Sequence, residues 1–137
     1  RRSSDLDKKP KITYYNSNVQ DEKRDIYRIY FTNITTESTD FKPYYELKLP
    51  AQRWNNLVFN YSSTHADLFV NGNLERTFRF NQNLPTYSPS DIIKTGSENG
   101  LHGAISNIRY YTKTLSNHRI TSMYNIFMKK EQPTINL

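Results

Sequence analysis

Short runs in which apolar and polar residues alternate occur through the first two thirds of the chain. Side chains on a β-strand point alternately to its two faces, so a period of two marks a strand with one buried face. Aromatic and β-branched residues, which favour strands, are concentrated in these runs, and turn-forming residues separate them. The predicted strands are Ile12–Tyr15, Asp25–Phe31, Tyr44–Leu49, Trp54–Tyr61, Ala66–Val70, Leu74–Phe80 and Asp91–Thr95.

A β-hairpin is the clearest local prediction. Asn71 and Gly72 join two alternating runs, and both residues tolerate the positive φ angles that a tight type I′ turn requires. We therefore assign Asn71 and Gly72 a structural role. The residues expected to share a face within each strand are Ala66, Leu68 and Val70 before the turn, and Leu74, Arg76, Phe78 and Phe80 after it.

The pattern changes near the end of the chain. Residues Gly100–Leu115 are predicted to form a strand with a bulge where Ile105 and Ile108 differ in parity. Ser116 then caps a predicted helix. Its apolar stripe, at helical spacing, consists of Ile120, Met123, Tyr124 and Phe127. We expect this stripe to pack against a sheet.

Trp54 is expected to be a core residue. It is the only tryptophan, and it opens a predicted strand whose partner, residues 68–70, has a buried face. Eleven tyrosines and seven phenylalanines supply further apolar area, so the core should be rich in aromatic side chains. The length of 137 residues fits one domain. We expect a lead-in at residues 1–10, the domain at 11–128 and a tail at 129–137.

The net charge of +6 comes from scattered basic residues and indicates a basic surface. No helix-turn-helix, ribonucleoprotein or zinc pattern accompanies it, so nucleic acid is not an expected partner. Cysteine is absent, which excludes disulfides and thiolate metal sites. No apolar run approaches the ~18 residues of a membrane span, so a membrane is expected as a partner only through an anchor outside this chain.

Three segments of the chain carry a resemblance to a known fold: Trp54 with Val58, "DLFVNG" at Asp67–Gly72, and "GAISNIRYYTKTLS" at Gly103–Ser116. Together they resemble the concanavalin A-like, laminin G-like jelly-roll domain. In that family the last segment is a strand led by glycine, which implies a structural role for Gly103. The resemblance covers about residues 50–125 and implies an all-β, antiparallel jelly-roll β-sandwich with one short C-terminal helix. The sequence, rich in Asn and Tyr, also resembles the versions of this domain in large nucleocytoplasmic DNA viruses.

Catalysis is not expected. Glycosidases of this fold place Glu-x-Asp-x-Glu on one strand, so that two carboxylates about 5 Å apart flank the sugar bond. Glu46, Glu75 and Glu98 have no acidic neighbour two residues away, and a Gly-x-Ser-x-Gly elbow is missing. We predict no enzyme activity, no cofactor and no catalytic residues. The three single histidines, expected to be structural, are His65, His102 and His118.

Metal binding is the next possibility that the resemblance raises. Some relatives hold calcium through Asp and Asn side chains on loops at the rim of the fold, and such oxygen ligands must converge from several loops. Asp67, Asn71 and Asn99 are available for this purpose. Structural positions, in a strand for the aspartate and in turns for the asparagines, account for these residues as well as metal binding does. We therefore assign no metal ligands.

Glycan binding is the function that the resemblance most often implies. Sugars dock on exposed aromatic rings with amide partners, and such groups are present in loops and strand ends. Pleating offers another explanation for the adjacent tyrosines, because one ring of each pair would then point into the core. The candidate ligand-binding residues are Tyr44, Tyr45, Tyr87, Asn99 and Tyr111.

Two functions remain after this reasoning. The viral resemblance favours a non-catalytic structural or interaction domain of a virion, assembled in the host cytoplasm and contacting capsid or membrane neighbours or another copy of the chain. The alternative is a lectin-like carbohydrate-binding module. Because the first residue is not methionine and the usual first strands of the fold are not recognisable before Ile12, we expect upstream sequence with a hydrophobic anchor.

Overall fold

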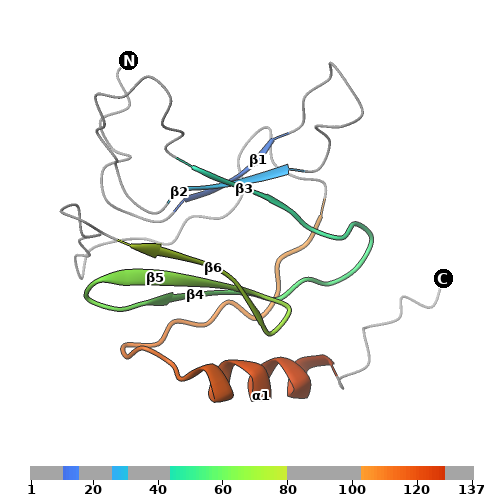
Figure 1. The fold of residues 1–137 in the computed structure, drawn as a ribbon. Helices are drawn as coiled ribbons and strands as arrows, with labels where there is room; N and C mark the ends of the chain where they lie inside the picture. Colours follow the sequence, from blue (N-terminus) through green and yellow to red (C-terminus); the bar gives the residue numbers. More distant parts are fainter. Residues whose placement is uncertain (1–10, 16–25, 31–43, 80–102, 129–137) are drawn as a thin grey trace, which may run out of the picture. The chain divides into compact units, whose positions relative to one another are not determined.

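The computed structural model describes residues 11–15, 26–30, 44–79 and 103–128. The chain divides into two compact units, and each is described by itself. The first unit comprises Arg1–Arg53 and Asn81–Ile108, and the second comprises Trp54–Phe80 and Arg109–Leu137. Each unit contains one antiparallel sheet of three strands, and the second also contains a helix (Figure 1).

The first unit holds the sheet β1 (Lys11–Tyr15), β2 (Ile26–Tyr30) and β3 (Tyr45–Lys48), in the order β1-β2-β3. Its buried face contains Ile29 and Leu47, which are 1% and 4% exposed. The opposite face is polar, since Arg28 and Glu46 are directly opposite each other in the register. One buried face and one polar face explain why apolar and polar residues alternate along these strands.

The second unit holds the sheet β4 (Leu57–Tyr61), β5 (His65–Val70) and β6 (Asn73–Arg79), again in sequence order. The predicted hairpin turn is confirmed. Asn71 and Gly72 have φ angles of 52° and 81°, and they connect the paired residues Val70 and Asn73. On β5, Ala66 and Leu68 are fully buried, as the alternation predicts.

A β-bulge in β6 places Leu74 on the opposite face from the one predicted. The register shifts between Leu68 and Phe69, so Leu68 lies opposite Arg76 while Phe69 lies opposite Leu74. Leu74 therefore shares the face of Phe69 and not that of Arg76. A period-two pattern cannot show an inserted residue, which is why the sequence placed Leu74 on the wrong face.

The helix α1 (Asn117–Met128) is capped as predicted. The backbone N–H of Arg119 donates to Ser116 Oγ at 3.3 Å, which is the N-cap bond to the third helical residue. Ile120 in the apolar stripe is 1% exposed, and Met123, Tyr124 and Phe127 are half-buried. Figure 1 shows α1 along one side of the β4-β5-β6 sheet.

Hydrogen bonds join α1 and the segment before it to the sheet of the same unit. The Asn60 side chain donates to Leu115 O at 3.0 Å and accepts from Leu115 N at 2.9 Å. Thr121 Oγ1 donates to Gly72 O at 3.3 Å. Asn60 lies opposite Asp67 in the register, so the segment before α1 contacts the sheet face that carries Asp67 and Phe69.

Two further predictions about the fold are wrong. Trp54 is not a core residue, because its side chain is 43% exposed and β4 begins only at Leu57. Residues 103–115 are not in a strand, and Ile105 and Ile108 are 69% and 58% exposed. The left-handed φ of Asn107, 55°, interrupts the extended backbone between the two isoleucines.

The all-β class with one short C-terminal helix is confirmed. The predicted strand Asp91–Thr95 lies outside the described residues. No helix in the described part of the chain is long and apolar enough to cross a membrane. The expected limits of the domain, after residue 10 and after residue 128, stay a prediction.

Candidate functional site

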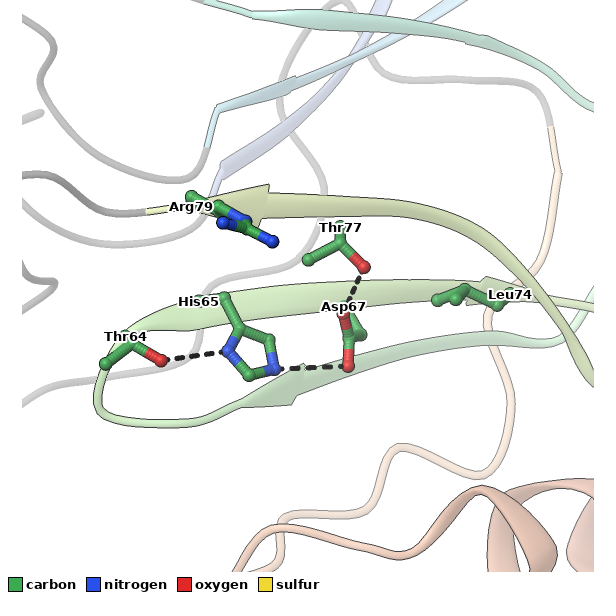
Figure 2. Close-up of a pocket in the computed structure, with 6 residues that line it drawn as sticks. All are labelled: Thr64, His65, Asp67, Leu74, Thr77 and Arg79. Atoms are coloured by element: carbon green, nitrogen blue, oxygen red, sulfur yellow. Dashed lines mark hydrogen bonds and ion pairs between the residues drawn. The ribbon is translucent and has the colours of Figure 1, made fainter.

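A pocket on the β5-β6 face of the second unit is the candidate site (Figure 2). Its volume is about 410 Å³, within the range of small-molecule sites. Five of its six side chains are polar or charged. The residues that line it are Thr64, His65, Asp67, Leu74, Thr77 and Arg79.

The strand register brings these side chains together. His65 lies opposite Arg79, and Asp67 lies opposite Thr77. Paired residues in antiparallel strands point to the same face, so four polar groups gather on one side of two adjacent strands. The bulge after Leu68 adds Leu74 to the same face, which gives the polar pocket one apolar wall.

Asp67 is the central acceptor of the pocket. Thr77 Oγ1 donates to Asp67 Oδ1 at 2.6 Å, and His65 Nε2 lies 3.5 Å from Oδ2 (Figure 2). Each carboxylate oxygen can accept about two hydrogen bonds. Since Thr77 contacts one oxygen and His65 the other, the carboxylate keeps capacity to accept from a ligand hydroxyl. Its side chain is 17% exposed, so a ligand can reach it.

His65 is held by the turn that precedes β5. Its Nδ1 lies 2.9 Å from Ser62 Oγ and 3.0 Å from Thr64 Oγ1. When the Thr64 hydroxyl donates to Nδ1, the ring hydrogen is on Nε2 and points to Asp67. The turn thus orients the imidazole along one edge of the pocket.

The order Ser62, His65, Asp67 superficially matches the connectivity of a hydrolytic triad. Ser62 Oγ, however, accepts the backbone N–H groups of Thr64 and His65 at 3.3 and 3.1 Å. It also lies 3.1 Å from the carbonyl oxygen of His65, to which it donates. Ser62 does not line the pocket. Its hydroxyl therefore closes a turn, and the arrangement is not that of an activated nucleophile.

The chemistry of the pocket suits a polyhydroxylated ligand. Asp67 supplies a charged acceptor, Arg79 a planar set of donors, and Thr64 and Thr77 supply hydroxyls. Leu74 is 51% exposed and offers an apolar contact beside them. The pocket can bind hydroxyl groups by hydrogen bonds while the leucine covers a C–H face.

The predicted tyrosine site is divided by the pleat of the first sheet. Tyr45 pairs with Ile29 and so lies on the buried face. Tyr44 lies on the polar face, where its ring is 4.4 Å from the Arg28 guanidinium carbon and 5.5 Å from the Tyr30 ring. Arg28 also contacts Glu46, with Nε 3.2 Å from Oε1. Of the two, only Tyr44 is on a polar surface, and neither lines the pocket.

Tyr111 belongs to the second unit and contacts the helix. Its hydroxyl donates to the Met123 sulfur at 3.7 Å, and the Arg119 guanidinium carbon lies 5.8 Å from its ring. The side chain is half-buried. Tyr87 and Asn99 lie outside the described residues, so the structure brings none of the five predicted ligand residues into the pocket.

Asn71, which the sequence offered as a possible calcium ligand, makes hydrogen bonds within the fold. Asn71 Oδ1 accepts the backbone N–H of Asn56 at 2.9 Å, and its Nδ2 donates to Asn55 Oδ1 at 3.1 Å. Both bonds fasten the hairpin turn to the residues before β4. Within residues 11–15, 26–30, 44–79 and 103–128, no three His, Asp or Glu side chains are grouped to hold a metal ion.

Sequence reasoning missed the pocket residues. The sequence predicts a structural role for His65 and offers Asp67 only as a possible ligand at the rim, although both are on one face of β5. The available signal was the spacing of two polar residues two apart in each strand, His65 with Asp67 and Thr77 with Arg79. That signal indicates a polar face only once the hairpin register, including the bulge, is known.

Residues 4–121 match the family described as the concanavalin A-like lectin/glucanases superfamily. A solved structure of an S-layer domain-containing protein from Clostridium thermocellum is similar at 15% identity and a TM-score of 0.41. That match covers 90% of this chain and 66% of the other, slightly less than two thirds of its length. Comparison with curated proteins gives no significant match.

Proposed function

Since the chain belongs to the concanavalin A-like lectin/glucanases superfamily, we propose that it is a non-catalytic, lectin-like domain that binds a carbohydrate in the β5-β6 pocket. The observation that carries this proposal is the placement of Asp67. Its carboxylate is oriented by Thr77 and accompanied by His65 at the centre of an accessible polar pocket.

Sugar hydroxyls are well matched to these groups. A charged acceptor forms stronger hydrogen bonds with hydroxyl donors than a neutral one does. Arg79 can donate to neighbouring hydroxyl or ring oxygens, and Leu74 can contact the apolar face of a sugar ring. The Thr77 bond fixes the carboxylate before the ligand arrives, which reduces the entropy lost on binding.

The same geometry argues against hydrolysis. Glycosidases of the usual type need two carboxyl groups that flank the bond. Asp67 is the single carboxylate among the residues that line the pocket. Glu75 is on the neighbouring strand but does not line the pocket. We therefore propose binding without turnover.

Replacing Asp67 with asparagine should abolish detectable carbohydrate binding, or weaken it by about tenfold or more, because a neutral amide is a poorer acceptor at this position. The shape of the side chain is kept. Binding is measured first on a printed glycan array, and then by calorimetry with the oligosaccharide that the array selects.

The matched control is Glu75→Gln, which neutralises an exposed acid on β6 outside the pocket. This variant should bind like the unaltered protein. Equal loss in both variants would show a non-specific effect of charge, and unchanged binding in Asp67→Asn would exclude the pocket. Thermal melting of each variant separates loss of binding from loss of folding.

No hydrolysis is expected on β-glucans and related polysaccharides. Reducing-sugar release should stay at the level of a heat-denatured sample. Turnover that disappears in Asp67→Asn or Glu46→Gln would contradict the prediction, because it would assign catalysis to carboxylates that we regard as non-catalytic.

The role in a virion remains a separate prediction. Virion neighbours, a further copy of the chain and location in a virion were expected from the viral resemblance, and neither the described residues nor the comparisons bear on them. Locating the protein in purified particles by imaging tests this role independently of carbohydrate binding.

A further inference from the structure

One side of α1 and the segment before it combine arginines with exposed apolar side chains. We call this the basic-apolar surface and define it by Arg109, Tyr110, Arg119 and Ile126. All four residues belong to the second unit, and none of them lines the pocket.

Aromatic rings hold the two arginines in place. The Arg109 guanidinium carbon lies 4.9 Å from the Phe127 ring centroid, and that of Arg119 lies 5.8 Å from the Tyr111 ring centroid. Tyr111 also donates to the sulfur of Met123. These contacts place residues 109–111 alongside α1 and reduce the mobility of both charges.

Large apolar groups are exposed beside these charges. Tyr110 and Ile126 are 74% and 60% exposed. Arg119 and Ile126 are seven residues apart, so they lie on the same side of the helix, while the buried Ile120 lies on another side. The contacts described within the second unit leave both large apolar side chains facing solvent.

The charge around this surface has one sign. The described residues 109–128 contain three Lys and Arg residues and no Asp or Glu. The whole chain carries a net charge of +6, so this stretch supplies half of its excess. The three basic residues are Arg109, Lys113 and Arg119.

We propose that the basic-apolar surface docks on an anionic phospholipid membrane. Cations attract the headgroups, while Ile126 and the ring of Tyr110 enter the boundary between headgroups and acyl chains. A helix of 12 residues is about 18 Å long, too short to span a bilayer, so it would lie in the plane of the interface. A nucleic acid or another soluble polyanion would use the arginines but would leave these apolar groups without a role.

Vesicle co-sedimentation tests the proposal directly. The protein is mixed with vesicles of phosphatidylcholine alone, or of phosphatidylcholine with about one third phosphatidylserine. We expect binding to the anionic vesicles that weakens with added salt, and little binding to the neutral ones. Arg119→Gln should weaken partition about fivefold, and Ile126→Ser should weaken it by roughly tenfold.

Matched controls are Arg76→Gln and Ile12→Ser, which remove an exposed arginine and an exposed isoleucine elsewhere. Both should bind like the unaltered protein. No binding to anionic vesicles, equal binding to neutral ones, or unchanged binding in Ile126→Ser would overturn the proposal. Duplex DNA that competes fully at an equal concentration of charge would instead identify a site for soluble polyanions. Melting curves confirm that each variant is folded.

Discussion

Replacing Gly72 with alanine is expected to lower the free energy of unfolding by about 3 kcal/mol, through backbone strain and overpacking together. Gly72 has φ of +81°, a left-handed conformation that residues with a Cβ rarely adopt. An added Cβ would also lie 2.6 Å from Tyr124 Cδ1 and 3.0 Å from its Cγ. These ring atoms lie close to the helix backbone, so the clash cannot be relieved by moving the free end of a side chain.

Thermal and urea unfolding measure this effect. A loss of this size should lower the melting temperature by about 10 °C. The control is Gly103→Ala, because Gly103 is exposed and does not have a positive φ. Its unfolding free energy should change by about 0.5 kcal/mol or less. Equal stability of the two variants would show that the hairpin turn does not pack on α1 as described.

Replacing Asn60 with alanine should also cost about 3 kcal/mol, because two backbone groups would lose their partners. Asn60 is 7% exposed, and its amide bonds both the N–H and the C=O of Leu115. These reciprocal bonds fasten the segment before α1 to β4. Urea unfolding followed by circular dichroism measures the loss.

Thr114→Ala gives the comparison at the same junction. The Thr114 hydroxyl donates to Tyr61 O at 2.7 Å, but this bond is exposed and water can replace it. We expect a loss of about 0.5–1 kcal/mol. A cost for Asn60→Ala no larger than this would show that the segment is not held by the Asn60 amide.

Local features of the fold were predictable from the sequence. The turn at Asn71 and Gly72 depends on the φ preferences of two adjacent residues, and the Ser116 cap depends on one side chain and the next turn of helix. The apolar stripe that contains Ile120 depends on spacing alone. In each case the cause and the structure lie within a few residues of one another.

Features that depend on register were not predictable. The bulge after Leu68 moves Leu74 to the pocket face, and nothing in the alternation of β6 indicates it. Trp54 is apolar and precedes a strand, but its exposure depends on where β4 begins. Asn107 interrupts a run that otherwise has strand-like composition. These outcomes depend on contacts between distant parts of the chain.

The residues of the candidate site were likewise not predictable where they depend on pleating and register. Aromatic residues suggested a ligand surface, but pleating separates Tyr44 from Tyr45, and Tyr111 contacts α1. The polar residues of the pocket are unremarkable one by one. His65 and Asp67 become a site only when the hairpin sets Thr77 and Arg79 opposite them.

The most direct test of the proposed function is a backbone amide NMR titration with the oligosaccharide that the glycan array selects. Carbohydrate binding in the β5-β6 pocket predicts saturable shifts at Thr64, His65, Asp67 and Thr77. In Asp67→Asn these shifts should be absent or should need about tenfold more ligand or higher to saturate. Saturable shifts confined to the polar face of the first sheet, around Arg28 and Tyr44, would contradict the proposed site. An array without any bound glycan would contradict the lectin-like function itself.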